Sequence, residues 1–374
     1  MGKKVVIAGH ICVDMTPAIP GEKVSSLHEI IAPGKLITAG DITISTGGAV
    51  ANTGLAMKIL GADATLMGKI GKDEFGEMVC RVLRQYGCED SMIVSEAAGT
   101  SYSIILAIPG IDRIVFHNPG ANDIFCPEDL DLDRIREASL FHFGYPPIMK
   151  SMYEADGAEL VRMFRMISEM GVLTSLDMAM VQEQTEAGRA DWTKIIKSVL
   201  PYTDFFVPSV EELLMMLDRE KYHTILERSG GRDITEVISL EEDVKPLAQR
   251  CIDMGAGCVL IKCGAPGLYY RTAGKEFAGM LSERTGHDCS DWAEQEGFED
   301  SYVPGRIRSA IGAGDTTIGA FLTAMLDGYP LKRCLQLAAA TGASCVETYD
   351  ALSGLKSFAE LEKRIDNGWE KNRR

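Results

Sequence analysis

The sequence has few positive charges. Its 374 residues include 38 Lys and Arg against 54 Asp and Glu, which gives a formal net charge of −16. An acidic surface of this kind repels nucleic acid and anionic lipid, so any phosphate group has to be bound locally. We therefore expect no nucleic-acid partner.

Long hydrophobic runs are also lacking. No stretch of the sequence reaches the roughly 18 apolar residues of a membrane-spanning helix. The apolar run near the start is interrupted by His10 and Asp14, too early for a signal peptide. These absences predict a cytoplasmic protein with no membrane partner.

Several chemical motifs are missing as well. The ten cysteines form no CxxC pair and no metal-ligand spacing, which predicts reduced, mostly buried thiols. The Walker A pattern fails because Gly68-Lys69 and Gly71-Lys72 are not followed by Ser or Thr. The dinucleotide pattern GxGxxG fails because Thr317 stands at its third glycine, and the protein-kinase signatures HRD and DFG are absent.

The chain does contain an alternation of strand and helix patterns. Residues 5–13 form an apolar, β-branched run typical of a strand covered on both faces, and Asp14 follows at the end where α/β sheets bind ligands. Further strands are predicted at 64–70, 140–144, 172–177, 204–207, 258–263 and 267–271, and helices at 75–86, 154–170 and 191–199. This pattern indicates a mainly parallel sheet covered by helices.

Other segments depart from the alternation. Two extended runs within 100–118 are joined by a Pro-Gly turn, which predicts a hairpin. The segments 218–240 and 274–306 are polar, and we interpret both as surface insertions. No repeat or low-complexity linker divides the chain into separate domains.

A turn of small residues at 309–314 comes directly before a helical pattern. Such a turn leaves backbone N–H groups unpaired at the positive end of the helix dipole, where a phosphate can bind. Asp315 stands near the first turn of this helix. Its simplest role would be to cap the helix.

Five motifs, taken together and in order, resemble the ribokinase-like (PfkB) family of carbohydrate kinases, over about residues 5 to 351. Each is short, and their order makes the resemblance specific. They are Asp14, the GGAVAN run at 47–52 with the GKIGKDEFG run at 68–76, SVEE at 209–212, KCGAPG at 262–267 and GAGD at 312–315.

The resemblance implies a three-layer α/β/α sandwich around a mainly parallel sheet, with a small β lid. It implies that Asp315 is the catalytic base that takes the proton of the acceptor hydroxyl. Gly312, Ala313 and Gly314 would form the anion hole for the phosphoryl group transferred from ATP. The residues that would bind the sugar are Asp14, Gly47, Gly48 and Asn52.

The same resemblance implies a nucleotide side. Glu212 would organise magnesium through water, although Ser209 replaces the Asn usual in that motif. The remaining positions that match ATP-binding ones are Ser209, Lys262, Gly264, Gly267, Ala339 and Gly342. The alternative for Lys262 is a solvated lysine at the end of a strand. The alternative for Ala339 and Gly342, the two small residues of the 338–346 helix, is simple helix packing.

The lid is expected to consist of residues 16–45 and 99–118, and the kinase core of 1–15, 46–98 and 119–374. Arg113 lies in the lid, where it would reach the acceptor or remain solvated. An exposed sheet edge would let two lids pair in a homodimer. Ser309-Ala310 replaces the Asp-Thr that binds a monovalent cation in many members, so we expect weak or no activation by potassium.

The expected activity is phosphorylation of a small sugar or sugar acid by ATP and magnesium, with a GGAVAN run closer to the fructokinase form than to the ribokinase form. Two alternatives stay open. A nucleoside kinase of the same fold would need an aromatic platform, for which Tyr102, Phe116 and Tyr145 are candidates. A sensor that binds sugar or nucleotide without catalysis would be consistent with Ser209.

Overall fold

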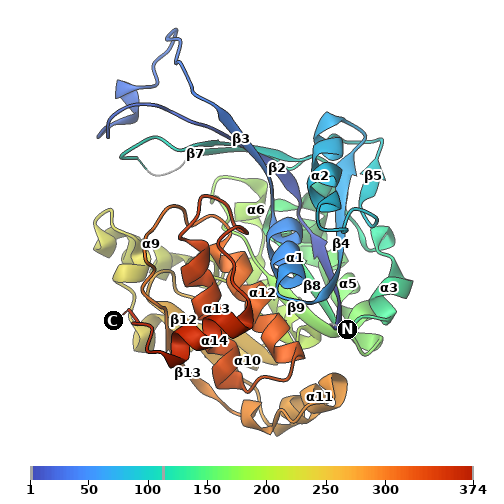
Figure 1. The fold of residues 1–374 in the computed structure, drawn as a ribbon. Helices are drawn as coiled ribbons and strands as arrows, with labels where there is room; N and C mark the ends of the chain where they lie inside the picture. Colours follow the sequence, from blue (N-terminus) through green and yellow to red (C-terminus); the bar gives the residue numbers. More distant parts are fainter. Residues whose placement is uncertain (1–2, 112–113, 373–374) are drawn as a thin grey trace.

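The computed structural model describes residues 3–111 and 114–372. Its main element is a nine-stranded sheet in the order β13-β12-β11-β10-β9-β8-β1-β4-β5 (Figure 1). The strands from β11 to β5 are parallel, and β12 and β13 are antiparallel additions at one edge. The strands of this sheet are β1 (Lys4–Gly9), β4 (Asp63–Gly71), β5 (Ile93–Ser95), β8 (Leu140–Gly144), β9 (Leu173–Asp177), β10 (Phe205–Phe206), β11 (Cys258–Lys262), β12 (Gly267–Thr272) and β13 (Glu296–Asp300).

Helices cover both faces of this sheet. One hydrophobic core lies under α1 (Ala49–Ile59), α2 (Glu74–Arg84), α11 (Lys275–Thr285), α12 (Ala313–Leu326), α13 (Leu331–Cys345) and α14 (Phe358–Asp366). The other lies under α3 (Leu132–Arg136), α4 (Lys150–Tyr153), α5 (Ala158–Glu169), α7 (Trp192–Val199), α8 (Val210–Leu217), α9 (Arg219–Ser229) and α10 (Lys245–Asp253), while α6 (Glu186–Arg189) is a short helix before α7.

The side chains of β1 show why the layers form. Val5 and Ile7 belong to the first core, whereas Val6 and Ala8 belong to the second. Successive side chains of a strand point to opposite faces, so an unbroken apolar strand needs a covering layer on each side. The three-layer α/β/α sandwich expected from the sequence is confirmed.

A second, four-stranded sheet projects from the body at the top of Figure 1. Its order is β3-β2-β6-β7, from β3 (Ile42–Gly47), β2 (Cys12–Pro17), β6 (Tyr102–Leu106) and β7 (Ile114–Asn118). The hairpin expected within 100–118 is formed by β6 and β7, which are antiparallel. This sheet is the small β lid that the sequence predicts, and we call it the lid sheet.

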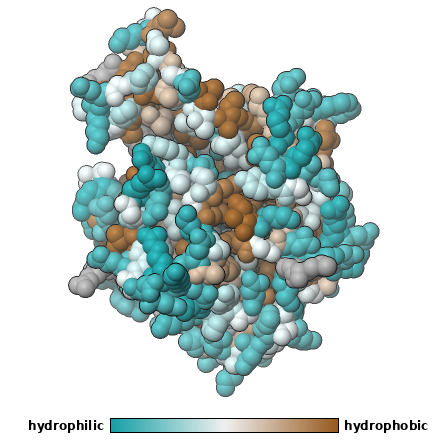
Figure 2. Space-filling view, in the orientation of Figure 1, coloured by the Kyte–Doolittle hydropathy of each residue, from teal (hydrophilic) through white to brown (hydrophobic). Residues whose placement is uncertain are grey.

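The two faces of the lid sheet differ in polarity. Asp14 lies opposite Ser45 and Ser103, and Ser103 lies opposite His117, so these polar residues share one face. The other face carries Ile44 and Phe116, which are 45% and 58% exposed. Figure 2 shows hydrophobic surface on this projecting part of the molecule.

The strand predicted at 5–13 is wrong in its extent. The chain leaves the main sheet after Gly9, which has φ of +121°. A Cβ on Gly9 would clash with the carbonyl oxygen of Gly144, so only glycine fits there. It enters the lid sheet at Cys12 as β2. Asp14 therefore lies within a lid strand instead of after the first strand of the main sheet.

The interpretation of 218–240 and 274–306 as surface insertions is also wrong. The first contains α9, and Ile225 and Ile234 are buried in the core. The second contains α11, the buried Trp292 and the edge strand β13. Their charges lie on the outer sides of amphipathic elements, so a polar composition did not mean an absence of core contacts.

The helix predicted at 154–170 is interrupted. Ala155 and Asp156 have positive φ values of 49° and 57°, and α5 begins only at Ala158. Gly157, with φ of +74°, completes this left-handed turn. A run of three left-handed residues breaks the hydrogen bonding of a helix, and the apolar periodicity of the segment does not reveal it.

Candidate active site

The candidate site lies at the carboxyl ends of the parallel strands. Asp177 ends β9, Lys262 ends β11, and Tyr145 follows β8. In open α/β sheets this edge is where ligands bind, because loops and helix N-termini converge there. The glycine-containing turns that begin α1 and α12 reach the same edge, since Asn52 and Thr53 of α1 contact Asp315 of α12.

Asp315 is buried and does not cap its helix. The N-cap of α12 is Gly312, which has φ of 70° and no side-chain cap, and Ala313 and Gly314 form the first turn. The carboxylate of Asp315 accepts hydrogen bonds from Asn52 Nδ2 at 3.0 Å, Tyr145 Oη at 2.6 Å and Thr53 Oγ1 at 3.4 Å. The capping alternative is therefore wrong, and the Asp315 carboxylate faces α1 and β8 instead.

Burial affects the protonation of two carboxyl groups here. It raises the pKa of Asp315, while hydrogen bonds from Tyr145 and Asn52 act in the opposite direction. Burial also raises the pKa of Asp14, to which the nearby charge of Asp315 contributes. Asp14 and Asp315 are thus close enough for their charges to interact, and each holds a proton more readily than an exposed Asp.

Lys262 is neither exposed nor solvated. Its Nζ lies 2.6 Å from Asp177 Oδ1, and the two side chains are 14% and 1% exposed. A Cβ placed on Gly314 would lie 3.4 Å from Lys262 Cδ, so the lysine stem runs against the first turn of α12. The alternative of a solvated lysine is wrong, because the ion pair with Asp177 fixes the ammonium group beside that turn.

Ser209 and Glu212 form a reciprocal capping box at the start of α8. The backbone N–H of Ser209 donates to Glu212 Oε2 at 2.6 Å, and that of Glu212 donates to Ser209 Oγ at 3.3 Å. Ser209 also forms a parallel bridge with Lys262. The charges of Glu212 and Asp315 both help to raise the pKa of Asp177, after burial. The structure therefore brings Ser209, Glu212 and Lys262 together near Asp315.

The turn at Gly47 and Gly48 is tightly constrained. A Cβ on Gly47 would clash with the carboxylate of Asp14, so the glycine lets the lid strand and the turn approach each other. Gly48 has φ of 88°, and a Cβ there would meet the carbonyl and the ring of His10. Both positions require glycine, because the turn lies directly against Asp14 at Gly47 and against His10 at Gly48.

The backbone conformation of the 264–267 loop requires glycine at both of its glycine positions. Gly264 has φ of 64°, and Gly267 has φ of 140° with the carbonyl of Glu299 against it. On α13, a Cβ on Gly342 would lie 2.5 Å from Thr317 Oγ1 of α12, and Ala339 is buried. Close packing of α12 and α13 thus accounts for the small residue at 342, the packing role left open by the sequence.

Several residues near the site were not found from the sequence. They are Thr53 and Asp177, and on the polar lid side His10, Cys12, Ser103 and His117. His10 Nε2 lies 3.3 Å from His117 Nε2, and His117 Nδ1 lies 3.1 Å from Ser103 Oγ. Burial lowers the pKa of both histidines. The alternation of strand residues could have placed His117 and Asp14 on one face once their pairing was known.

Arg113 lies outside the described residues, so its predicted contact with the acceptor has no structural description. Tyr102 contacts Phe75 at 5.6 Å between ring centroids, and Phe116 lies on the apolar face of the lid sheet. Of the three aromatic candidates, only Tyr145 contacts Asp315, through its hydroxyl group.

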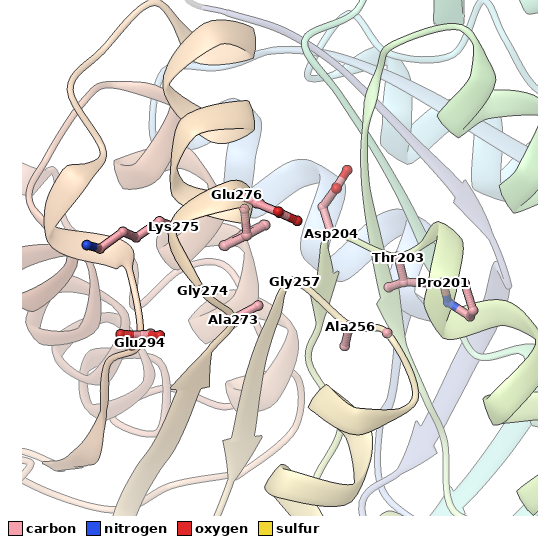
Figure 3. Close-up of a pocket in the computed structure, with 12 residues that line it drawn as sticks. Pro201, Thr203, Asp204, Ala256, Gly257, Ala273, Gly274, Lys275, Glu276 and Glu294 are labelled. Carbon is pink, nitrogen blue, oxygen red and sulfur yellow. The ribbon is translucent and has the colours of Figure 1, made fainter.

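A cavity of about 660 Å³ lies away from this site (Figure 3). Its walls include Asp204, which precedes β10, and Gly257, which precedes β11, together with Lys275 and Glu276. It therefore opens at the amino ends of the strands, the opposite edge of the sheet from Lys262 and Asp177.

Within 3–111 and 114–372, no helix is both long and apolar enough to cross a membrane. In the same part of the chain, no three His, Cys, Asp or Glu side chains are placed to hold a metal ion.

Comparison with known sequences identifies the family. The model for pfkB family carbohydrate kinases matches residues 3–357. The chain belongs to this family and is therefore a phosphotransferase with a sugar hydroxyl as acceptor. Fructokinase-2 of Solanum habrochaites is 26% identical over 374 positions, covering 97% of this chain and 96% of that protein. An uncharacterized sugar kinase of Archaeoglobus fulgidus is 23% identical over 301 positions, covering 80% of this chain and 98% of its own length.

Solved structures share the fold. Ribokinase from Giardia lamblia gives a TM-score of 0.71 at 18% identity, covering 98% of this chain and 99% of its own. Ribokinase from Arabidopsis thaliana, complexed with ribose and ATP, gives 0.69 at 19% identity, covering 97% and 98%. The fold is ribokinase-like.

Proposed function

We propose that this protein transfers the γ-phosphoryl group of ATP to a hydroxyl group of a small sugar or sugar acid. One observation carries the proposal: the buried carboxylate of Asp315 lies in the first turn of α12 and contacts Asn52 of the glycine turn. Fructokinase relatives and a ribokinase complexed with ribose and ATP support the substrate class.

In the proposed reaction, Asp14, Asn52 and the backbone at Gly47 and Gly48 hold the acceptor. Asp315 accepts the proton of the acceptor hydroxyl as the oxygen of that group bonds to the γ-phosphorus. The bond from the γ-phosphorus to the bridging oxygen breaks, and ADP leaves. The developing charge is stabilised by N–H groups at 312–315 and by the Lys262 ammonium group.

We assign the nucleotide to the side of the site formed by Ser209, Lys262, Gly264 and Gly267, with adenine along α13 near Ala339 and Gly342. Loop geometry supports this, because Lys262 leads directly into the 264–267 turn and lies against Gly314. The acidic character of the chain makes such local positive groups necessary.

Magnesium fits the carboxylate donors present. Glu212 uses Oε2 in the capping box, and within residues 3–111 and 114–372 its Oε1 has no hydrogen bond, so Oε1 could accept one from a metal-bound water. Mg²⁺ at phosphate-transfer sites takes one or two carboxylates together with waters and phosphate oxygens, so a cage made only of protein groups is not needed. When bound, the ion would neutralise phosphate charge.

A sugar fits the site better than a nucleoside. A nucleoside base needs an aromatic surface, and Tyr102 and Phe116 lie on the lid face opposite to Asp14. The third aromatic candidate, Tyr145, is held at the site by its hydrogen bond to Asp315. The face shared with Asp14 carries Ser45, Ser103 and other hydrogen-bonding groups, which suit the hydroxyl groups of a polyol.

We further propose that the lid sheet, which begins at Cys12 and not at residue 16 as expected from the sequence, acts as a lid over the acceptor, and that two lids pair in a homodimer. The exposed apolar side chains Ile42, Ile44 and Phe116 on one face of the lid sheet support pairing. A cytoplasmic location agrees with the ten free cysteines, which need a reducing compartment.

The experiment is a panel of sugars, sugar acids and nucleosides with ATP and magnesium, read by ADP release. Release that depends on a sugar supports the proposal, release that depends on a nucleoside favours the alternative kinase, and ligand binding without release favours a sensor. The Asp315→Asn variant should lose about 10²- to 10⁴-fold in turnover while it keeps its melting temperature. Near-normal turnover of that variant would contradict the role of Asp315.

A further inference from the structure

We propose that Tyr145 is the positioning residue of the catalytic base: its hydroxyl group holds Oδ1 of Asp315, so that Oδ2 receives the proton of the acceptor. This inference rests on the proposed function, because it requires Asp315 to be the base. It assigns separate tasks to the two oxygen atoms of one carboxylate.

The hydrogen bonds around Asp315 are unequal. Oδ1 accepts from Tyr145 Oη at 2.6 Å and from Thr53 Oγ1 at 3.4 Å. Within the described parts of the chain, Oδ2 accepts from Asn52 Nδ2 at 3.0 Å and from no further side chain. Each carboxylate oxygen has room for about two donors. Oδ2 therefore retains an acceptor position and Oδ1 does not.

Asn52 also links Oδ2 to the acceptor. It lies on the first helical turns of α1, directly after the Gly47 and Gly48 turn that approaches Asp14. A hydroxyl group held at this turn approaches Asp315 from the side of Asn52. Oδ2 is thus the oxygen bound by the residue that we assign to the acceptor, and Tyr145 binds the other oxygen.

The backbone of Tyr145 is built for this contact. Tyr145 has φ of 72° and ψ of 41°, a left-handed conformation that a bulky residue rarely adopts, and Pro146 and Pro147 follow it. Strained residues persist where the surrounding structure fixes them, often at functional sites. Here the strained turn brings the ring from the end of β8 to a carboxylate 170 positions further along the chain.

The protonation states agree with these tasks. Burial and then the charge of Asp315 raise the pKa of Tyr145 well above its ordinary value, so its hydroxyl remains a donor at working pH. The hydrogen bond from Tyr145 lowers the pKa of Asp315, against the effect of burial. Tyr145 thereby opposes the effect of burial on the pKa of the base, in addition to orienting its carboxylate.

The test is the pH profile of kcat for Tyr145→Phe, which keeps the ring and removes the hydroxyl. Loss of one hydrogen bond to the ionised form raises the pKa of Asp315, so the acid limb should move to higher pH by about one unit. Turnover should fall about tenfold on that limb, and the KM of the acceptor should change by less than about threefold, since Asp14 and Asn52 remain.

Tyr302→Phe is the matched control. The Tyr302 hydroxyl is buried and has no hydrogen-bond partner within the described residues, so its removal should leave the pH profile unchanged. An unshifted acid limb in Tyr145→Phe would overturn the inference. So would higher turnover or a lower KM, because Tyr145 would then be blocking the acceptor position.

The two proposals fail in different ways. If Asp315→Asn retains near-normal turnover, the assigned base is wrong, and with it the proposed mechanism. If Asp315→Asn is inactive while Tyr145→Phe keeps the wild-type profile, only the positioning role of Tyr145 is wrong.

Discussion

At the scale of single residues, the site holds two buried carboxylates with different partners. Asp315 is bound by neutral donors, Tyr145, Asn52 and Thr53, whereas Asp177 is paired with the Lys262 cation. A carboxylate paired with a buried ammonium group is a poor base, because taking up a proton would leave the cation unpaired. The ion pair therefore makes Asp177 a holder of Lys262, and Asp315 the group free to accept a proton.

Replacement of Lys262 tests whether Asp177 serves to hold the lysine. Lys262→Met leaves the Asp177 carboxylate buried without its cation, which should lower the free energy of unfolding by about 3 kcal/mol at alkaline pH, where Asp177 is ionised. Burial already raises the pKa of Asp177 to about 8. The penalty should be full above this raised pKa and disappear as the pH falls and Asp177 takes up a proton. Denaturant unfolding at several pH values measures it.

The double variant Lys262→Met with Asp177→Asn separates stability from catalysis. It removes both charges, so much of the lost stability should return relative to Lys262→Met alone. The KM of ATP should stay raised by about tenfold in both variants if the ammonium group binds phosphate. Recovery of the KM together with the stability would show that Lys262 is only structural.

The residues before α12 predict the response to monovalent cations. Ser309 Oγ accepts from the Ile311 N–H at 3.1 Å, and neither Ser309 nor Ala310 has a carboxylate. We expect similar turnover in potassium and in a bulky organic cation. A tenfold response, equal to about 1.4 kcal/mol of transition-state stabilisation, would contradict this expectation.

At the scale of elements, the segment 369–372 supports the 264–267 loop. Trp369 stacks on Tyr302 at 4.8 Å between ring centroids and donates from Nε1 to the carbonyl of Val303 at 2.7 Å. Asn372 Nδ2 donates to the carbonyl of Ala265 at 3.1 Å and to Ser301 Oγ at 2.7 Å. This segment thus fixes a loop that we assign to the nucleotide.

Asn372→Ala should therefore weaken nucleotide binding without affecting the acceptor. Loss of the bond to Ala265 should raise the KM of ATP by about fivefold, the effect of one hydrogen bond of average strength. Steady-state kinetics with each substrate varied in turn measures this, with Asn367→Ala, at the exposed C-cap of α14, as the control. An equal rise in the KM of the acceptor would indicate a general loss of structure.

The lid sheet shows how register separates two surfaces. The pairing of Asp14 with Ser103, and of Ser103 with His117, places the polar residues of three strands on one face. Since side chains alternate along a strand, a slip of one residue in β7 would turn His117 outward and Phe116 toward the acceptor. The polarity of the lid face that we assign to the acceptor therefore depends on strand register.

At the scale of the whole molecule, an acidic chain carries a cation and a helix N-terminus at its candidate site. Lys262 and the N–H groups at the start of α12 lie there among carboxyl groups, and Lys262 is paired with Asp177. General attraction of anions is weak on such a surface, which favours selection of a nucleotide by specific contacts.

The apolar outer face of the lid sheet predicts the oligomeric state. Light scattering at micromolar concentration should give the mass of a dimer, and Phe116→Asp should give the mass of a monomer, because it places a charge within the apolar contact. Val94→Asp is the control, since Val94 is 56% exposed on β5, at the far edge of the main sheet. A monomeric wild-type protein would contradict dimerisation.

Much of the fold follows from local pattern. Unbroken apolar strands such as β8 require two covering layers. The hairpin within 100–118 was predictable because a Pro-Gly turn stands between its two extended runs. Patterns fail where the backbone departs from them, as at Gly9 and at Ala155 and Asp156. They fail also in the acidic segment 274–306, where the helix α11 buries one of its faces in the core.

The sequence by itself determined the family motifs and the α/β architecture, because these depend on short-range spacing and apolar periodicity, and the resemblance to the PfkB family marked Asp315 and Asn52 as candidate site residues. Only the tertiary structure decided the partners of Asp315 and Lys262. Tyr145 is 170 positions from Asp315, and Asp177 is 85 positions from Lys262. Such contacts arise when parallel strands place their carboxyl ends at one edge, and no local pattern records that register.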